Sequence, residues 1–112
     1  MKKEWNSRAK ADHKYFISYS NNDEEFSLSG KDDLDAYVVP ILDKIVQNRN
    51  PKDLKVLEIG CGAGRVVKWL STIFGEVYGI DISEEMINQA KIYCNEIANV
   101  TEFSPCILSN DT

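Results

Sequence analysis

The sequence predicts an α/β fold with a Rossmann-like, open parallel sheet and helices on both faces. Three observations lead to this class. Short apolar segments alternate with amphipathic helical segments from Asp32 onward. A glycine-rich turn at residues 60–64 follows the first apolar segment, and Asp81 ends the second one. Because strands that alternate with helices are joined by right-handed crossovers, we expect the strands to pair in parallel.

Length and composition indicate one globular domain. The chain has 112 residues, of which 43% are hydrophobic and 28% are charged, and its net charge is −5. An acidic chain does not suit bulk nucleic-acid binding. We expect no membrane association, because the apolar runs are too short and Met1-Lys2-Lys3-Glu4 leads into polar residues. Three cysteines without a C-x-x-C pair and a single histidine predict no metal site, and indicate reduced thiols in the cytoplasm.

The segment before the first strand predicts a cap and a helix. Residues 1–30 are mixed in character, and we expect a helical or irregular cap there, followed by the main domain over residues 31–112. From Asp32 the apolar residues recur at helical spacing and predict a helix of about four turns. Pro40 should kink this helix or divide it in two, and Asn50-Pro51 should end it.

Three strands and two helices are predicted beyond this point. Residues 54–59 read as a strand that Gly60 stops, and residues 66–74 as a helix that Gly75 closes. Residues 76–80 form the second strand. Ser83 is a suitable N-cap for a helix that continues to residue 97. Residues 100–108 form a third strand, which Pro105 weakens.

The residue types between Glu58 and Asp81 point to a nucleoside ligand. Glycines at alternate positions in the strand–helix turn permit positive φ and let a ligand approach the backbone. Asp81 lies 21 residues after Gly60, where an acid in this architecture accepts hydrogen bonds from ribose hydroxyls. A carboxylate at Glu58 would repel a pyrophosphate but suits a cationic ligand.

A dinucleotide is the alternative ligand. The dinucleotide pattern has Gly or Ala at its sixth position, which here is Arg65, and the third glycine is Gly64, one residue early. The Arg65 side chain would crowd the turn if it pointed inward, or else extend to solvent. An NAD-dependent oxidoreductase or epimerase therefore stays open as a second function.

The run from Val56 to Arg65 resembles motif I of the class I S-adenosylmethionine-dependent methyltransferases, and the run from Val77 to Met86 resembles the strand and helix start that follow it. The resemblance covers residues 34–112 and is most specific over 56–91, while Trp5-Asn6-Ser7-Arg8-Ala9 resembles the opening of some small bacterial members. It implies S-adenosylmethionine as the cofactor. The cofactor-binding positions that it implies are Glu58, Gly60, Cys61, Gly62, Gly64, Asp81, Ile82, Met86 and Asp111.

The resemblance also implies a role for most of these positions. Gly60, Cys61 and Gly62 would contact the methionine part through their backbone, and Glu58 would help to hold its amino group. Asp81 would accept the two ribose hydroxyls, while Ile82 and Met86 would line the adenine pocket. Asp111, or Asn110 if the register differs by one, would lie near the adenine amino group.

The same resemblance implies that the chain would be the N-terminal cofactor-binding half of an enzyme that methylates a small-molecule acceptor. The sequence ends at Thr112, directly after the third predicted strand. The family's substrate pocket and most of its catalytic side chains follow that strand, and no residue here is a credible general base. We therefore expect the chain alone to have no turnover and to bind the cofactor weakly. The first strand would expose an unpaired edge suited to self-association, so a non-catalytic half-fold that partners another subunit is a further alternative.

Overall fold

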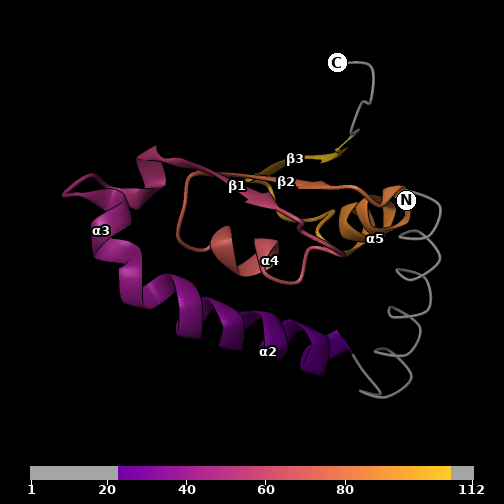
Figure 1. The fold of residues 1–112 in the computed structure, drawn as a ribbon, viewed down its shortest axis with the longest axis horizontal. Coiled ribbons are helices and arrows are strands. Elements are labelled where there is room, and N and C mark those ends of the chain that lie inside the picture. The colour runs from indigo at the N-terminus through magenta and orange to yellow at the C-terminus, as the bar shows by residue number, and fades with distance from the viewer. Residues whose placement is uncertain (1–22, 107–112) are drawn as a thin grey trace.

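A three-stranded parallel sheet forms the centre of the fold. The computed structural model describes residues 23–106, and its strands β1 (Lys55–Ile59), β2 (Glu76–Asp81) and β3 (Val100–Pro105) pair in the order β1-β2-β3 (Figure 1). All three strands begin within one residue of where the sequence predicts them, and β3 ends at Pro105, earlier than the predicted residue 108. Both pairings are parallel. The predicted open α/β sheet is therefore confirmed.

Helices α4 (Val67–Leu70) and α5 (Glu84–Tyr93) cover one face of this sheet. The covered face carries Val77 and Phe103, which are buried together with Ile87 of α5. The predicted helices on both faces are not found among residues 23–106. The physical reason is the strand order, because two right-handed crossovers that step in the same direction place both helices on the same side. A helix on the second face needs a reversal of strand order.

The other face of the sheet exposes apolar side chains of β1. Leu57 is 51% exposed and Ile59 is 78% exposed. Neither residue has a described helix over it, since α4 and α5 lie on the opposite face.

The helical segment before the sheet starts earlier than the sequence predicts, and it is not uniform. Helix α2 runs over Asp23–Asp33, followed by the π-helical turn η1 (Leu34–Val38), the 3₁₀ turn η2 (Val39–Ile41) and α3 (Leu42–Val46). The helix predicted from Asp32 is thus continuous with α2, which begins in the segment where a helical or irregular cap is predicted, and the predicted break at Pro40 is confirmed. Pro40 has no N–H to donate and its ring displaces the carbonyl of the preceding turn, so the helix widens before it and tightens at it.

Helix α2 packs on α4 through small residues. Its buried residues are Ser27 and Gly30. A Cβ on Gly30 would overlap the carbonyl oxygen of Arg65, so only glycine permits this close approach of the two backbones. Helix α2 continues through the domain boundary that is predicted between residues 30 and 31. This boundary remains a prediction. Residues 1–22 of the predicted cap lie outside the described residues.

We expect Gly30→Ala to destabilise the protein although alanine favours helix. The added methyl group forces α2 away from Arg65, at a cost of about 1–3 kcal/mol in the free energy of unfolding. Urea denaturation followed by circular dichroism measures this change. Asp32→Ala, at an exposed position of the same helix, is the matched control. A Gly30→Ala protein as stable as the wild type would contradict this packing.

Helix α5 begins as the sequence predicts. Ser83 precedes it in extended conformation, and its Oγ accepts a hydrogen bond from the Met86 N–H at 3.2 Å. This is the predicted N-cap. Helix α4 is shorter than predicted, and turns replace its last part up to Gly75. Among residues 23–106, no helix is both long and apolar enough to cross a membrane.

Candidate functional site

The turn after β1 is built by three glycines in left-handed conformation. Gly60, Gly62 and Gly64 have φ values of 74°, 56° and 85°. The N–H groups of Gly60 and Cys61 both donate to the Ile80 carbonyl, at 2.8 and 3.0 Å, which fixes the turn against the end of β2. Side chains other than glycine are strained at such φ values. The glycines thus bring the turn to the carboxyl edge of the sheet.

Asp81 joins the turn to the start of α5. Its Oδ2 accepts a hydrogen bond from the Gly62 N–H at 2.9 Å, and its Oδ1 accepts one from the Ser83 N–H at 2.8 Å. The two predicted halves of the site, the glycine turn and the acid one strand away, are therefore in direct contact. Each carboxylate oxygen keeps a second lone pair for another donor.

Glu58 is a part-buried carboxylate beside this turn. It lies opposite Gly79 in the β1–β2 register, on the face that the helices cover. Its Oε1 is buried and has no hydrogen-bond partner among the described residues. Burial raises the pKa of Glu58 to about 7, the Arg65 guanidinium opposes this, and the Asp33 and Asp81 carboxylates add to it. An acid with an unused buried oxygen suits a ligand that brings a cation or another donor.

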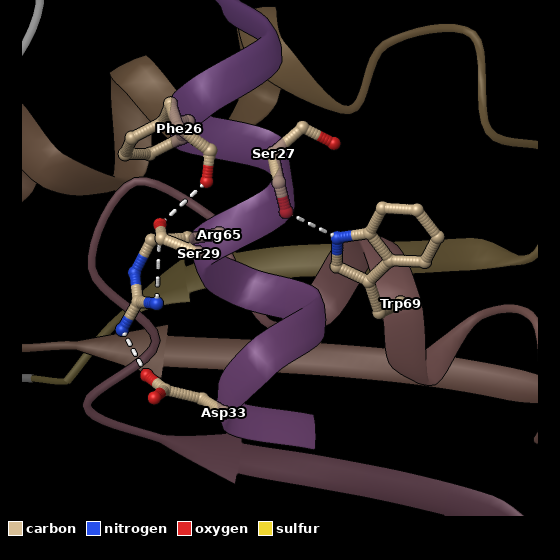
Figure 2. A network of polar contacts seen from close by, with 6 residues as sticks. All are labelled: Phe26, Ser27, Ser29, Asp33, Arg65 and Trp69. Atoms are coloured by element: carbon tan, nitrogen blue, oxygen red, sulfur yellow. Dashed lines mark hydrogen bonds and ion pairs between the residues drawn. The ribbon is translucent and has the colours of Figure 1, made fainter. Parts of the chain in front are cut away.

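Arg65 points away from the turn toward α2. Its Nη2 forms an ion pair with Asp33 Oδ2 at 2.6 Å, and its Nη1 donates to Ser29 Oγ at 3.4 Å (Figure 2). Arg65 therefore does not crowd the turn, and the steric argument against a dinucleotide does not apply. Gly64 fills the close-packing role one residue earlier, since a Cβ there would lie 3.0 Å from Cys94 Sγ.

The other predicted cofactor positions differ in how far the structure describes them. The space beside Gly60 is open, since a Cβ there would have no atom within 4 Å, and a Cβ on Gly62 would lie 4.0 Å from Met86 Cε. Ile82 follows Asp81 and is half-buried. Asp111 and Asn110 lie outside the described residues. The structure thus gathers Glu58, the three glycines, Asp81 and Met86 in one place, while the roles assigned to them remain predictions.

Cys61 lies between the first two glycines and is buried. Burial, with smaller contributions from the Asp81 and Glu58 carboxylates, raises the pKa of its thiol to about 12. A thiol with this pKa is neutral at physiological pH and is not a nucleophile. The side chain of Cys61 therefore acts as a small packing group. Residues 23–106 contain no cluster of three side chains able to hold a metal ion.

Sequence reasoning missed the contacts of α2 with the turn and with α4. Trp69 Nε1 donates to the Ser27 carbonyl at 2.6 Å, and Lys68 Nζ donates to Ser27 Oγ at 2.7 Å. Figure 2 shows the Trp69–Ser27 hydrogen bond on the same helix that carries Asp33. The buried side of α2 is formed by serine and glycine, so a search for apolar periodicity cannot find it. The three-residue spacing of Ser27 and Gly30 is the signal that was available.

Comparison with known proteins finds similarity to methyltransferases over the residues of this site. The family model described as "Methyltransferase domain" matches residues 56–105. Magnesium protoporphyrin IX methyltransferase from Synechocystis PCC 6803, solved with bound SAH, is 26% identical over 74% of this chain, with a TM-score of 0.53. The DhpI–SAH complex shares the fold, with 22% identity over 93% of this chain and a TM-score of 0.52. The chain spans 38% and 42% of the lengths of these two proteins. No curated protein sequence matches the chain.

Proposed function

We propose that the protein transfers a methyl group from S-adenosylmethionine to a small-molecule acceptor, because residues 56–105 match the methyltransferase-domain family model and the chain resembles a methyltransferase solved with bound SAH. The observation that carries this proposal is the contact between the glycine turn and Asp81, beside the unpaired oxygen of Glu58. The activity is proposed for the whole protein, since the chain spans less than half of the solved relatives named above.

The described residues fit this cofactor. Its ammonium group is a cation with several donors, and Glu58 offers a buried carboxylate oxygen without a partner in residues 23–106. Its ribose presents two hydroxyls, and Asp81 retains acceptor capacity after binding two amides. The open space beside Gly60 admits a ligand against the backbone. The groups on the protein thus agree in kind with the requirements of the cofactor.

Each residue has a definite task in the proposed site. Glu58, in its ionised form, accepts a hydrogen bond from the ammonium group and attracts its charge. Asp81 orients the sugar and at the same time holds the turn through the Gly62 N–H. Ile82 and Met86 cover the adenine and exclude water. When bound, S-adenosylmethionine supplies a methyl group activated by a positively charged sulfur. The contribution of the protein is alignment of this group and exclusion of water.

The acceptor and the location belong to the same proposal. A small molecule is favoured as acceptor because the net charge of −5 does not suit nucleic acid. A cytoplasmic location is supported by Cys61, Cys94 and Cys106, all free thiols. The exposed Leu57 and Ile59 support self-association as a further property.

Calorimetric titration of the purified protein with S-adenosylhomocysteine and with NAD tests the proposed function. NAD is the informative competitor because Arg65 leaves the turn open to a dinucleotide. We expect S-adenosylhomocysteine to bind at least about tenfold more tightly, since the pyrophosphate of NAD would meet the Glu58 carboxylate. Tighter binding of NAD would favour the oxidoreductase alternative, and binding of neither ligand would refute the proposed function.

A further inference from the structure

The Arg65 guanidinium pairs with one carboxylate and influences the charge of a second one. It contacts Asp33 on α2 at 2.6 Å. It is also close enough to Glu58 to stabilise the ionised form of that residue, yet Glu58 Oε1 has no hydrogen-bond partner among residues 23–106. Arginine pairs readily with any carboxylate that its fork can reach. A structural cause is therefore needed for the pairing of Arg65 with Asp33 instead of Glu58.

The docking of α2 supplies this cause. Gly30 lets the helix backbone approach the Arg65 carbonyl, and Ser27 receives hydrogen bonds from Lys68 and Trp69 of α4. These contacts hold α2 in place one helical turn before Asp33. The Asp33 carboxylate therefore lies beside the Arg65 guanidinium in the ligand-free protein. Ser29 Oγ accepts a second hydrogen bond from the same guanidinium (Figure 2).

We propose that Asp33 is a positioning residue that holds the Arg65 guanidinium away from Glu58 and so keeps the Glu58 carboxylate available for the ammonium group of the cofactor. This inference rests on the proposed function. Without Asp33, the arginine would turn to Glu58 and occupy the oxygen that the ligand needs. Arg65 would then compete with the cofactor as an internal cation.

The charges around Glu58 set the direction of each effect. Arg65 on the turn lowers the pKa of Glu58, whereas Asp33 on α2 and Asp81 on β2 raise it. Removal of Asp33 lowers the pKa of Glu58 for two reasons. A nearby negative charge is lost, and the Arg65 guanidinium moves closer to Glu58. Removal of Arg65 in addition raises this pKa again.

Three variants test the proposal: Asp33→Ala, the double variant Asp33→Ala with Arg65→Ala, and the control Asp35→Ala. Asp35 pairs with Lys31 at 2.9 Å on the exposed side of the same helical segment, so its loss removes an equal charge away from the turn. Titration calorimetry with S-adenosylhomocysteine gives the affinity. Carbon-detected NMR of the Glu58 carboxyl group in the ligand-free protein gives its pKa.

We expect Asp33→Ala to weaken binding about tenfold, and the double variant to recover to within about threefold of wild type, because the competing cation is gone. The pKa of Glu58 should fall in the single variant and rise again in the double variant, with Asp35→Ala like wild type in both measurements. A double variant that binds no better than Asp33→Ala, or an unchanged Glu58 pKa in Asp33→Ala, would overturn the proposal. The NMR titration needs no cofactor, so a protein that binds none still tests the Asp33–Arg65–Glu58 arrangement, while refuting the proposed function separately.

Discussion

Asp81→Ala is expected to weaken cofactor binding strongly and to destabilise the folded protein at the same time. The substitution removes both acceptors of the Gly62 and Ser83 N–H groups. Loss of two charge-assisted hydrogen bonds should lower the free energy of unfolding by about 2–4 kcal/mol. Affinity for S-adenosylhomocysteine should fall by about 100-fold or more, since the ribose loses its acceptor as well. Titration calorimetry and urea denaturation measure the two effects.

Two further variants separate binding from folding at Asp81. Asp81→Asn keeps the shape and one acceptor oxygen, so we expect it to fold while still binding at least about tenfold more weakly. Asp53→Asn removes an exposed carboxylate before β1, at the other end of the strand from the turn, and should change neither quantity. Normal affinity in Asp81→Asn would show that the carboxylate does not hold the ligand.

Glu58→Gln is expected to stabilise the ligand-free protein while weakening cofactor binding. The folded pKa of Glu58 is about 7 against an ordinary value of 4.5, so the folded state binds the proton more tightly than the unfolded chain. The free energy of unfolding of the wild type therefore declines as pH rises from about 4.5 to about 7, and it stays lowered above that range. At pH 8 the variant should be more stable by about 1–2 kcal/mol. This gain is smaller than the full pKa difference would give, because solvent screens the part-buried Glu58 carboxylate. At pH 4 the two proteins should be alike.

The affinity of the wild type should follow the same titration. Because the ammonium group binds the ionised carboxylate, affinity for S-adenosylhomocysteine should rise as pH increases through about 7 and then level off. Glu58→Gln should bind about tenfold more weakly at pH 8 and lose this dependence. Glu96→Gln, which removes an exposed carboxylate beyond α5, is the control of equal charge. A pH-independent wild-type affinity would exclude Glu58 as the acceptor of the ammonium group.

Much of the site can be predicted from the sequence because its main residues follow directly from chain order. Glu58 and the glycine turn come at the end of one strand and Asp81 at the end of the next, and parallel strands bring their carboxyl ends to one edge. Ser83 is an N-cap that depends on three neighbouring residues alone. These features are local, or follow from one rule of topology, so neither needs knowledge of packing.

The direction of Arg65 and the role of α2 required the tertiary structure. Asp33 and Arg65 are 32 residues apart, and nothing in the periodicity of either segment pairs them. The buried side of α2 is polar and small, so its contact with α4 is decided by a close backbone approach at Gly30. The coverage of a single sheet face likewise depends on strand order, which adjacent residues do not encode. Local propensity and chain order thus determined the strands and the cofactor turn, while long-range packing decided which carboxylate the arginine meets.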